Sequence, residues 1–544
     1  MPPGDKGALS ADSAEARAER LNTRAAGVVG LAVLCSRVLG LAREQIFAAL
    51  FGGGRVMDAF TIAFRIPNLL RDLFAEGALS TAFVTTFSKT VATEGDGAAW
   101  RLANKVATLA AVSLSVITLL GIAFAPALVA VLAPGFAGEK AELTVTLTRV
   151  MYPFILLVSL AALVMGVLNA RNVFGVPAMA SSFFNLGSIV AGVLLGYWLD
   201  PHFGTRAILG LAVGTLIGGA LQLTVQLPAL ARLGYRFHPD FHWRDPGVRS
   251  ILRLMGPSVI AASTTQVNVL INSVFASELG DGPTFWLTVA FRLMQLPLGV
   301  FGVALGTVTL PLLARMAATG QHGVFRTELA RGMRLAFLMT IPASVGLIVL
   351  AEPIISVLYQ HGRFGAHETA ESAGALRYYA LGLCGYAALK VLVNAFYALD
   401  RRKTPMVVSF VAVVINLVLN WIFTVRLGWG HRGLAFSTAC VATSNFLILY
   451  LLMRAHLGRL ESRAMAALLG RVALASLVLL GIAWGGGQLL LADWAVQPFW
   501  PKLASLTLVI LCAAVAFFLC ASALGITEVR ELGRAVRRRL RRAG

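Results

Sequence analysis

Charged side chains inside apolar sequence are the first sign of chemistry in this chain. The stretch from Ser36 to Ser88 is hydrophobic enough to lie in a bilayer, yet it contains Arg37, Arg43, Asp58, Arg65, Arg71 and Glu76. One charge at the bilayer centre costs about 2.5 to 3.5 kcal/mol on insertion scales, so such residues normally face a water-filled cavity or a partner. The pattern predicts a hydrated, cationic chamber within the membrane.

Arginine suits a phosphate ligand, because its planar guanidinium donates two parallel hydrogen bonds and stays charged when partly buried. The arginines that lie well inside predicted spans are the candidate substrate ligands for a diphosphate, namely Arg37, Arg43, Arg71 and Arg292. Four other charged residues are predicted to support the same chamber: Asp58, Arg65, Glu76 and Lys390. The alternative is that these side chains snorkel to an interface or form static ion pairs.

Helical geometry limits how these residues can share a site. Arg37 and Arg43 are six residues apart, which is about 240° around a helix with 3.6 residues per turn. They can therefore face one chamber only if it wraps around the first span, or one of them points elsewhere. Lys390 is equally open to two interpretations, a coupling or counter-ion site, or a charge that neutralises an acid.

Other motifs favour neither a metal centre nor an enzyme. Two i, i+4 asparagine pairs, Asn268 with Asn272 and Asn416 with Asn420, either hydrogen bond between helices or form a weak cation site. The chain has no nucleotide-binding loop, no HExxH motif and no serine-nucleophile arrangement. We therefore predict no catalytic residues, no cofactor and no metal beyond that weak cation site at Asn416 and Asn420.

Composition indicates a polytopic membrane protein. Of 544 residues, 58% are hydrophobic and 13% charged, whereas a soluble domain has roughly 25% charged residues. The net charge of +20 does not point to nucleic acid, because the basic residues lie mainly between apolar segments, as orientation in a membrane requires. The five cysteines all lie in apolar segments, which argues against a disulfide framework.

The apolar segments predict an all-α fold with about fourteen transmembrane helices, at roughly 20 residues per span. Their expected limits are 26–50, 58–88, 106–133, 147–169, 178–199, 206–230, 251–277, 284–314, 333–359, 374–398, 406–426, 434–455, 468–491 and 503–524. Pro67 is expected to kink or interrupt the second span. Loops after even-numbered spans hold most of the lysine and arginine, which predicts that both termini are cytoplasmic.

A weak internal repeat divides these spans. The dipeptide at 64–65 recurs at 291–292, and the motifs at 78–81 and 204–207 recur at 304–307 and 430–433, an offset of about 226 residues. The offset covers six spans, so the two halves have the same orientation, as in parallel-repeat transporters. The predicted parts are a cytoplasmic tail 1–25, lobes 26–231 and 251–456 joined by a cytoplasmic linker 232–250, a helix pair 457–525, and a basic cytoplasmic tail 526–544.

The segment from Ser36-Arg37-Val38-Leu39-Gly40 to Ala75-Glu76-Gly77-Ala78 resembles the signature of the MurJ/MviN family. These are bacterial lipid II flippases of the multidrug/oligosaccharidyl-lipid/polysaccharide exporter superfamily. Further matches follow in family order at 132–136, 168–170, 255–257, 302–307, 358–364, 396–398 and 403–405. The resemblance covers roughly residues 26–455 and fades in the last two spans.

The resemblance implies fourteen helices in two six-helix lobes plus a terminal pair that forms a lipid-tail groove. It implies alternating access that moves lipid II, an undecaprenyl-diphosphate disaccharide-pentapeptide, from the cytoplasmic to the periplasmic leaflet of the bacterial inner membrane for cell-wall synthesis. The arginines matching Arg37, Arg43, Arg71 and Arg292 would line the cavity, and the aspartate matching Asp58 would also matter. Lipid II and membrane lipids are the implied partners, with cell-wall synthesis enzymes as further candidates and no nucleic acid.

Two departures from the family leave the energy source open. The acids that often flank the arginine of the eighth span are replaced here by Phe291 and Gln295, and the acid of a sodium site in the eleventh span corresponds to Asn420. Two rival functions also stay open at this point. One is export of other polysaccharide-linked lipids or of drugs, and the other is a scaffold for the cell-wall or division machinery that moves nothing.

Overall fold

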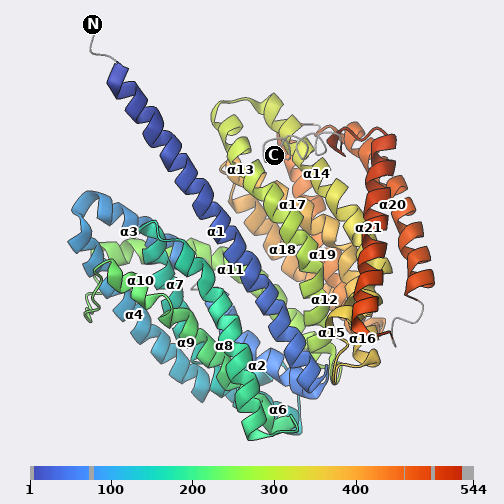
Figure 1. Cartoon of the computed structure of the whole chain (residues 1–544), viewed down its shortest axis with the longest axis horizontal. Coiled ribbons are helices and arrows are strands. Elements are labelled where there is room, and N and C mark those ends of the chain that lie inside the picture. Colours follow the sequence, from blue (N-terminus) through green and yellow to red (C-terminus); the bar gives the residue numbers. More distant parts are fainter. Residues whose placement is uncertain (1–4, 73–78, 459, 492–496, 530–544) are drawn as a thin grey trace. The chain divides into compact units, whose positions relative to one another are not determined.

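The structure is a computed structural model that describes residues 5–72, 79–458, 460–491 and 497–529. Every regular element within these ranges is a helix (Figure 1), which confirms the predicted all-α class. Glu76 and most of the basic tail, residues 530–544, lie outside the described residues.

The described residues contain ten helical segments that are long and apolar enough to cross a membrane. An eleventh is the bent pair of α16 (Ala366–Leu381) and α17 (Leu383–Ala398), whose axes differ by 42°. The other three predicted spans coincide with helices that carry more charge or are interrupted: α1 (Asp5–Phe51), α2 (Arg55–Arg71) followed by α3 (Ser80–Glu94), and α11 (Pro246–Ser277). The protein is therefore a multi-pass membrane protein, and the count of fourteen stays a prediction.

The chain divides into two compact units. The first contains residues 1–51 and 59–266, and the second contains residues 52–58 and 267–544. Besides α1, most of α2, α3 and the first part of α11, the first unit holds α4 (Asp96–Ala123), α5 (Ala125–Leu132), α6 (Gly138–Met151), α7 (Phe154–Ala170), α8 (Gly175–Leu199), η2 (Thr205–Ala207), α9 (Ile208–Thr224) and α10 (Leu227–Arg232).

Within the first unit, α8 and α9 approach so closely that only glycine fits between them. Gly210, Gly214 and Gly218 recur every four residues and so lie on one face of α9. A Cβ atom added to Gly210 would lie 2.2 Å from the Gly196 nitrogen, and one added to Gly214 would lie 2.4 Å from the Gly192 nitrogen. Small residues at this spacing let helix backbones touch, which is a common basis of helix association in membranes.

The second unit continues from α11 with α12 (Pro283–Pro297), η3 (Leu298–Gly302), α13 (Val303–Ala318), α14 (His322–Val349), α15 (Ala351–Tyr359), α16, α17, α18 (Lys403–Asn420), η4 (Trp421–Arg426), α19 (Gly430–Leu457), α20 (Ser462–Leu490) and α21 (Phe499–Ala523). The elements η3 and η4 are π-helical turns. η3 directly follows Pro297, whose missing N–H weakens the regular α-helical hydrogen bonding at that point.

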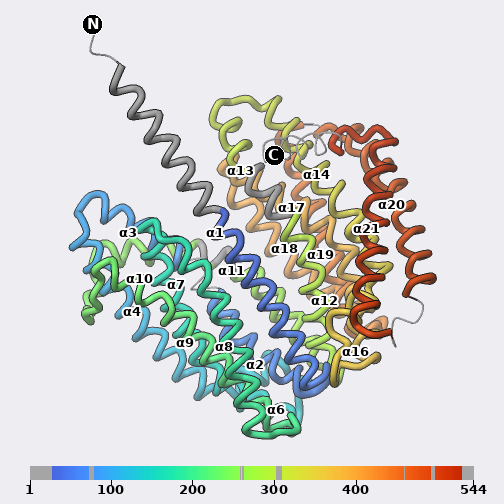
Figure 2. The backbone as a smooth tube through the Cα atoms, viewed as in Figure 1, coloured from blue at the N-terminus to red at the C-terminus, as the bar shows by residue number. Residues whose placement is uncertain are grey.

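The last two helices form an antiparallel pair at one side of the second unit (Figure 2). Their shared core packs against α14 through Leu338, Val472, Val509 and Phe517. On α14, Arg334 forms ion pairs with Glu461, directly before α20, and with Glu528, after α21, the latter at 2.8 Å between Nε and Oε1. Arg334 therefore connects the start of α20 and the segment after α21 to α14.

Candidate functional site

Arg43 is held in the first unit by aromatic rings. Its guanidinium carbon lies 5.7 Å from the centre of the Phe64 ring of α2 and 4.9 Å from that of Phe184 of α8. Phe154 of α7 packs against both rings, at 5.4 Å from each. Cation–π contact at such distances stabilises a permanently charged group by about 0.5 to 2 kcal/mol, depending on how far it is desolvated. The aromatic cluster thus fixes a positive charge at the meeting point of four helices.

Arg37 has a different environment. Its side chain is exposed and forms no hydrogen bond or ion pair with any residue that the structure describes. The main chain beside it is fixed, because Asn185 of α8 donates a hydrogen bond to the Ser36 carbonyl at 3.1 Å. The side-chain environments of Arg37 and Arg43 therefore differ, which their separation of about 240° around α1 allows. Asn185 is a positioning residue that our sequence reasoning missed, and its only signal is an amide within an apolar helix.

Arg71 ends α2 in an ion pair with its neighbour. The Asp72 carboxylate oxygen Oδ1 accepts from Nη2 of Arg71 at 2.7 Å and from Nε at 3.1 Å, and both side chains are partly exposed. Arg65 is partly buried six residues earlier, and the helix continues through Pro67 without a break. The interruption expected at this proline is thus absent from α2, which ends at Arg71.

Asp58 is buried completely and contacts a helix N-terminus in the second unit. Its Oδ2 accepts from the Gly282 N–H at 2.7 Å and its Oδ1 from the Phe285 N–H at 2.9 Å. Gly282 is the N-cap of α12 and has φ +108°, a conformation that favours glycine. The Phe285 N–H also donates to the Gly282 carbonyl at 3.0 Å, so the carboxylate shares this donor, and its negative charge lies at the positive end of the helix dipole.

The remaining predicted site residues belong to the second unit. Arg292 is partly buried on α12, two turns after the residues that Asp58 caps, and Lys390 is exposed on α17. The candidate diphosphate ligands are thus distributed over both units, with Arg37, Arg43 and Arg71 in the first and Arg292 in the second.

The four asparagines form one cluster of amides between α11 and α18. Asn416 donates to the side-chain oxygens of Asn268 and Asn272 at 3.0 and 3.1 Å, and Asn420 donates to that of Asn272 at 2.7 Å. Asn272 in turn donates to the Thr438 hydroxyl of α19 at 3.2 Å. The side-chain oxygen of Asn420 is buried and accepts no hydrogen bond within the described part of the chain. The cluster therefore ties three helices together through neutral side chains.

Comparison with known proteins shows which family has this kind of sequence and fold. The sequence model described as "Lipid II flippase MurJ" matches residues 47–505. The chain belongs to the lipid II flippase MurJ family. This confirms the resemblance found in the sequence.

Relatives support the assignment at the level of sequence and of structure. A protein of Burkholderia cenocepacia named lipid II flippase MurJ is 37% identical over 427 residues, covering 77% of this chain and 81% of that protein. A relative from Rhizobium tropici is 35% identical over 524 residues, covering 94% and 96%.

A solved structure of lipid II flippase MurJ in an inward closed conformation matches with a TM-score of 0.74 at 25% identity, covering 90% of this chain and 98% of that one. A MATE family transporter of the MOP superfamily matches with a TM-score of 0.62 at 17% identity, covering 80% and 95%, which shows a shared fold alone.

Proposed function

We propose that this chain moves lipid II across the bacterial inner membrane, from the cytoplasmic to the periplasmic leaflet, and that it does so as a transporter without catalysis. The observation that carries the proposal is the match of residues 47–505 to the lipid II flippase MurJ family. The charge pattern agrees with it, because the diphosphate of lipid II is negatively charged and the apolar helices of this chain retain arginines. Both termini would lie in the cytoplasm, and enzymes of peptidoglycan synthesis would consume the exported lipid.

In this proposal each arginine has a role in phosphate binding that follows from its surroundings. Arg37 is exposed and has its full set of donors available, so it suits first capture of a phosphate. Arg43, held on the rings of Phe64 and Phe184, supplies a fixed positive charge at a constant place in its unit. Arg292, partly buried on α12, is the candidate phosphate ligand of the second unit.

Arg71 suits an exchange of partners. A partly exposed ion pair is worth only about 0 to 1 kcal/mol, so the Asp72 carboxylate holds Arg71 weakly. A phosphate oxygen offers a stronger, charge-assisted hydrogen bond to the same Nε and Nη2 donors. Binding of the diphosphate would therefore replace the Asp72 contact, and release of the substrate would restore it.

The test is complementation in a bacterium depleted of its own flippase. Outer-leaflet lipid II is measured with this chain supplied, or with Arg37→Ala, Arg37→Lys or the exposed loop variant Arg402→Ala in its place. We expect export with the native chain and the loop variant, strong loss with alanine, and only partial recovery with lysine, since lysine cannot form the bidentate contact. Normal insertion of the native chain without export of lipid II would refute the proposed substrate.

The alanine result also separates binding from a structural role. Loss of export at a normal membrane level of the Arg37→Ala protein supports a substrate contact. Loss of the protein itself would instead favour a static, structural role for Arg37 and would count against the site.

A further inference from the structure

The loop between α10 and α11 is held along one side of α4 by hydrogen bonds and an ion pair. Asn104 donates to the Arg236 carbonyl and accepts from the His238 N–H, both at 3.3 Å. Thr108, one turn later on α4, accepts from the Asp240 N–H at 3.0 Å. Lys105 forms an ion pair of 2.6 Å with Asp245 at the far end of the loop. These contacts hold the loop at a defined level along α4, and we call residues 236–244 with Arg101 the linker surface.

That level coincides with the change from polar to apolar sequence in α4. Lys105 is its last charged residue, and residues 106–138 contain no Asp, Glu, Lys, Arg or His. The apolar run is the part of this segment suited to the hydrocarbon core, so its first residues mark the edge of that core. Because the loop crosses α4 between Asn104 and Thr108, the linker surface lies at the membrane–water interface.

The residue types on the linker surface fit this depth. Three large aromatic side chains are exposed, Phe237 (53%), Phe241 (61%) and Trp243 (56%). Arg236 and Arg244 are exposed at the two ends of this group in the sequence, and the Arg244 guanidinium lies 4.9 Å from the Trp243 ring centre. Aromatic rings concentrate at the headgroup level of a bilayer, and basic side chains beside them attract anionic lipids.

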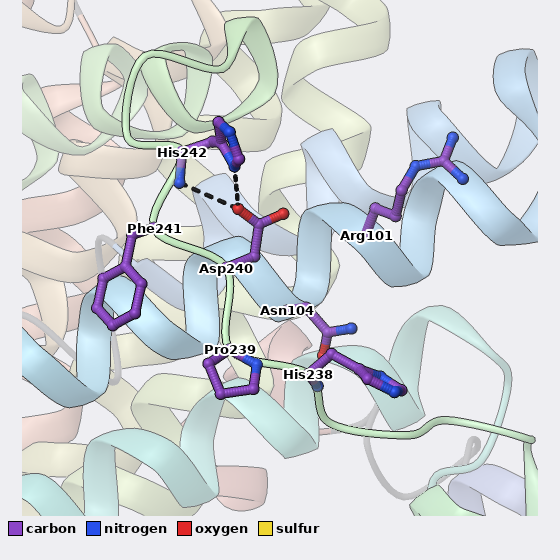
Figure 3. A pocket seen from close by; sticks show the side chains of 7 residues that line it. All are labelled: Arg101, Asn104, His238, Pro239, Asp240, Phe241 and His242. Carbon is purple, nitrogen blue, oxygen red and sulfur yellow. Dashed lines mark hydrogen bonds and ion pairs between the residues drawn. The ribbon is translucent and has the colours of Figure 1, made fainter.

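A pocket of about 480 Å³ opens on the same surface, lined by Arg101, Asn104, His238, Pro239, Asp240, Phe241 and His242 (Figure 3). In the view of Figure 3, Arg101 and His238 extend to one side of the loop, whereas Phe241 projects to the other. The carboxylate of Asp240 is already engaged, since it accepts from the His242 N–H at 3.1 Å and contacts the ring nitrogen Nδ1 of the same residue. The pocket thus combines the exposed basic side chain of Arg101 on one side with the apolar ring of Phe241 on the other.

We propose that the linker surface binds anionic phospholipid headgroups of the leaflet it faces. The guanidinium groups of Arg101, Arg236 and Arg244 contact the phosphates, and the exposed rings enter the layer of glycerol and upper acyl chains. The occupant is a membrane phospholipid rather than transported cargo, so this proposal does not depend on what the chain transports.

The decisive measurement is lipid retention by the purified full chain in native mass spectrometry, with phosphatidylglycerol, phosphatidylethanolamine or phosphatidylcholine added. The test variant replaces Arg101, Arg236 and Arg244 with glutamine. The matched control removes the same charge from another exposed basic loop, through Arg401→Gln, Arg402→Gln and Lys403→Gln. We expect the test variant to lose phosphatidylglycerol about fivefold for each arginine removed, from the usual contribution of a basic residue at an anionic surface, and the control to change much less.

Hydrogen exchange supplies a second, independent readout. Amide protons of residues 236–244 should exchange more slowly in phosphatidylglycerol nanodiscs than in phosphatidylcholine nanodiscs, and replacing Phe237, Phe241 and Trp243 with serine should remove that difference. Equal phosphatidylglycerol retention by the test variant and the native chain would overturn the proposal. So would equal retention of all three lipids, or protection of the linker by soluble glycerol 3-phosphate alone, which would assign the site to a free phosphate.

Discussion

The cap that Asp58 places on α12 allows the most detailed prediction. Its carboxylate accepts two main-chain hydrogen bonds, from Gly282 at 2.7 Å and Phe285 at 2.9 Å, and is completely buried. Hydrogen bonds to charged groups contribute about 1.5 to 3 kcal/mol each. Without the carboxylate, the Phe285 N–H keeps the Gly282 carbonyl at 3.0 Å, whereas the buried Gly282 N–H loses the acceptor described here. Asp58→Ala should therefore destabilise the second unit by about 3 to 5 kcal/mol, more than an exposed cap would.

Asp58→Asn should cost less, about 2 kcal/mol, because the amide keeps one acceptor but turns an N–H donor toward one of the two main-chain donors. The assay is thermal unfolding of the purified protein in detergent, followed by circular dichroism. Asp400→Asn is the control, since this carboxylate is exposed in a loop and its removal should leave the transition unchanged.

The expected order of unfolding temperatures is native and Asp400→Asn together, then Asp58→Asn, then Asp58→Ala. An Asp58→Ala protein that unfolds with the native chain would refute the capping argument. If Asp58→Asn keeps native stability but loses export, the carboxylate acts on the substrate or on a transport step instead.

Three further predictions follow from other contacts. Arg334→Gln leaves two carboxylates without their shared partner, so it should lower the unfolding temperature by an amount equivalent to about 2 kcal/mol and speed protease cleavage between α19 and α20. Burial raises the pKa of Asp245, but the hydrogen bonds from Lys105 and from main-chain N–H groups outweigh it, so the pKa lies below its ordinary value. Ionised Asp245 then stabilises the linker fully at pH values above the ordinary carboxyl pKa of about 4, and the stabilisation is lost as the pH falls through the lowered pKa. Hydrogen exchange of the linker should therefore speed up as the pH falls through that lowered pKa. In Lys105→Gln the same increase should occur at a higher pH. Asn420→Asp puts a carboxylate 2.7 Å from the Asn272 oxygen, so sodium chloride should raise its unfolding temperature relative to choline chloride, whereas the native chain should not respond.

The helical class and the positions of most spans were predictable because apolar segments of span length have only one solution in a bilayer. The angle between Arg37 and Arg43 was predictable from their spacing alone, whereas the sequence left open whether both face one chamber. The amide cluster also has a sequence signal, because Asn416 and Asn420 lie one turn apart on a single helix face.

Contacts between distant segments were not predictable. Nothing in the sequence indicates that Asp58 reaches Gly282, because a cap supplied by another helix leaves no local pattern. The same holds for Asn104, whose amide orders a loop more than a hundred residues away. Helix α2 likewise continues through Pro67, although the local preference of a proline inside a helix is to kink or interrupt it.

The glycine contact between α8 and α9 has a consequence for how such a chain can evolve. A single inserted residue in either helix would rotate every later side chain by about 100°. An insertion at the start of α9 would turn Gly210, Gly214 and Gly218 away from α8, and one before Gly192 in α8 would turn Gly192 and Gly196 away from α9. Either change would bring bulkier side chains into the contact. Substitutions at exposed positions of these helices leave this contact in place, whereas a change of length within them does not. Insertions and deletions that arise in this part of the gene should therefore survive only in the segments before α8, between α8 and α9, and after α9.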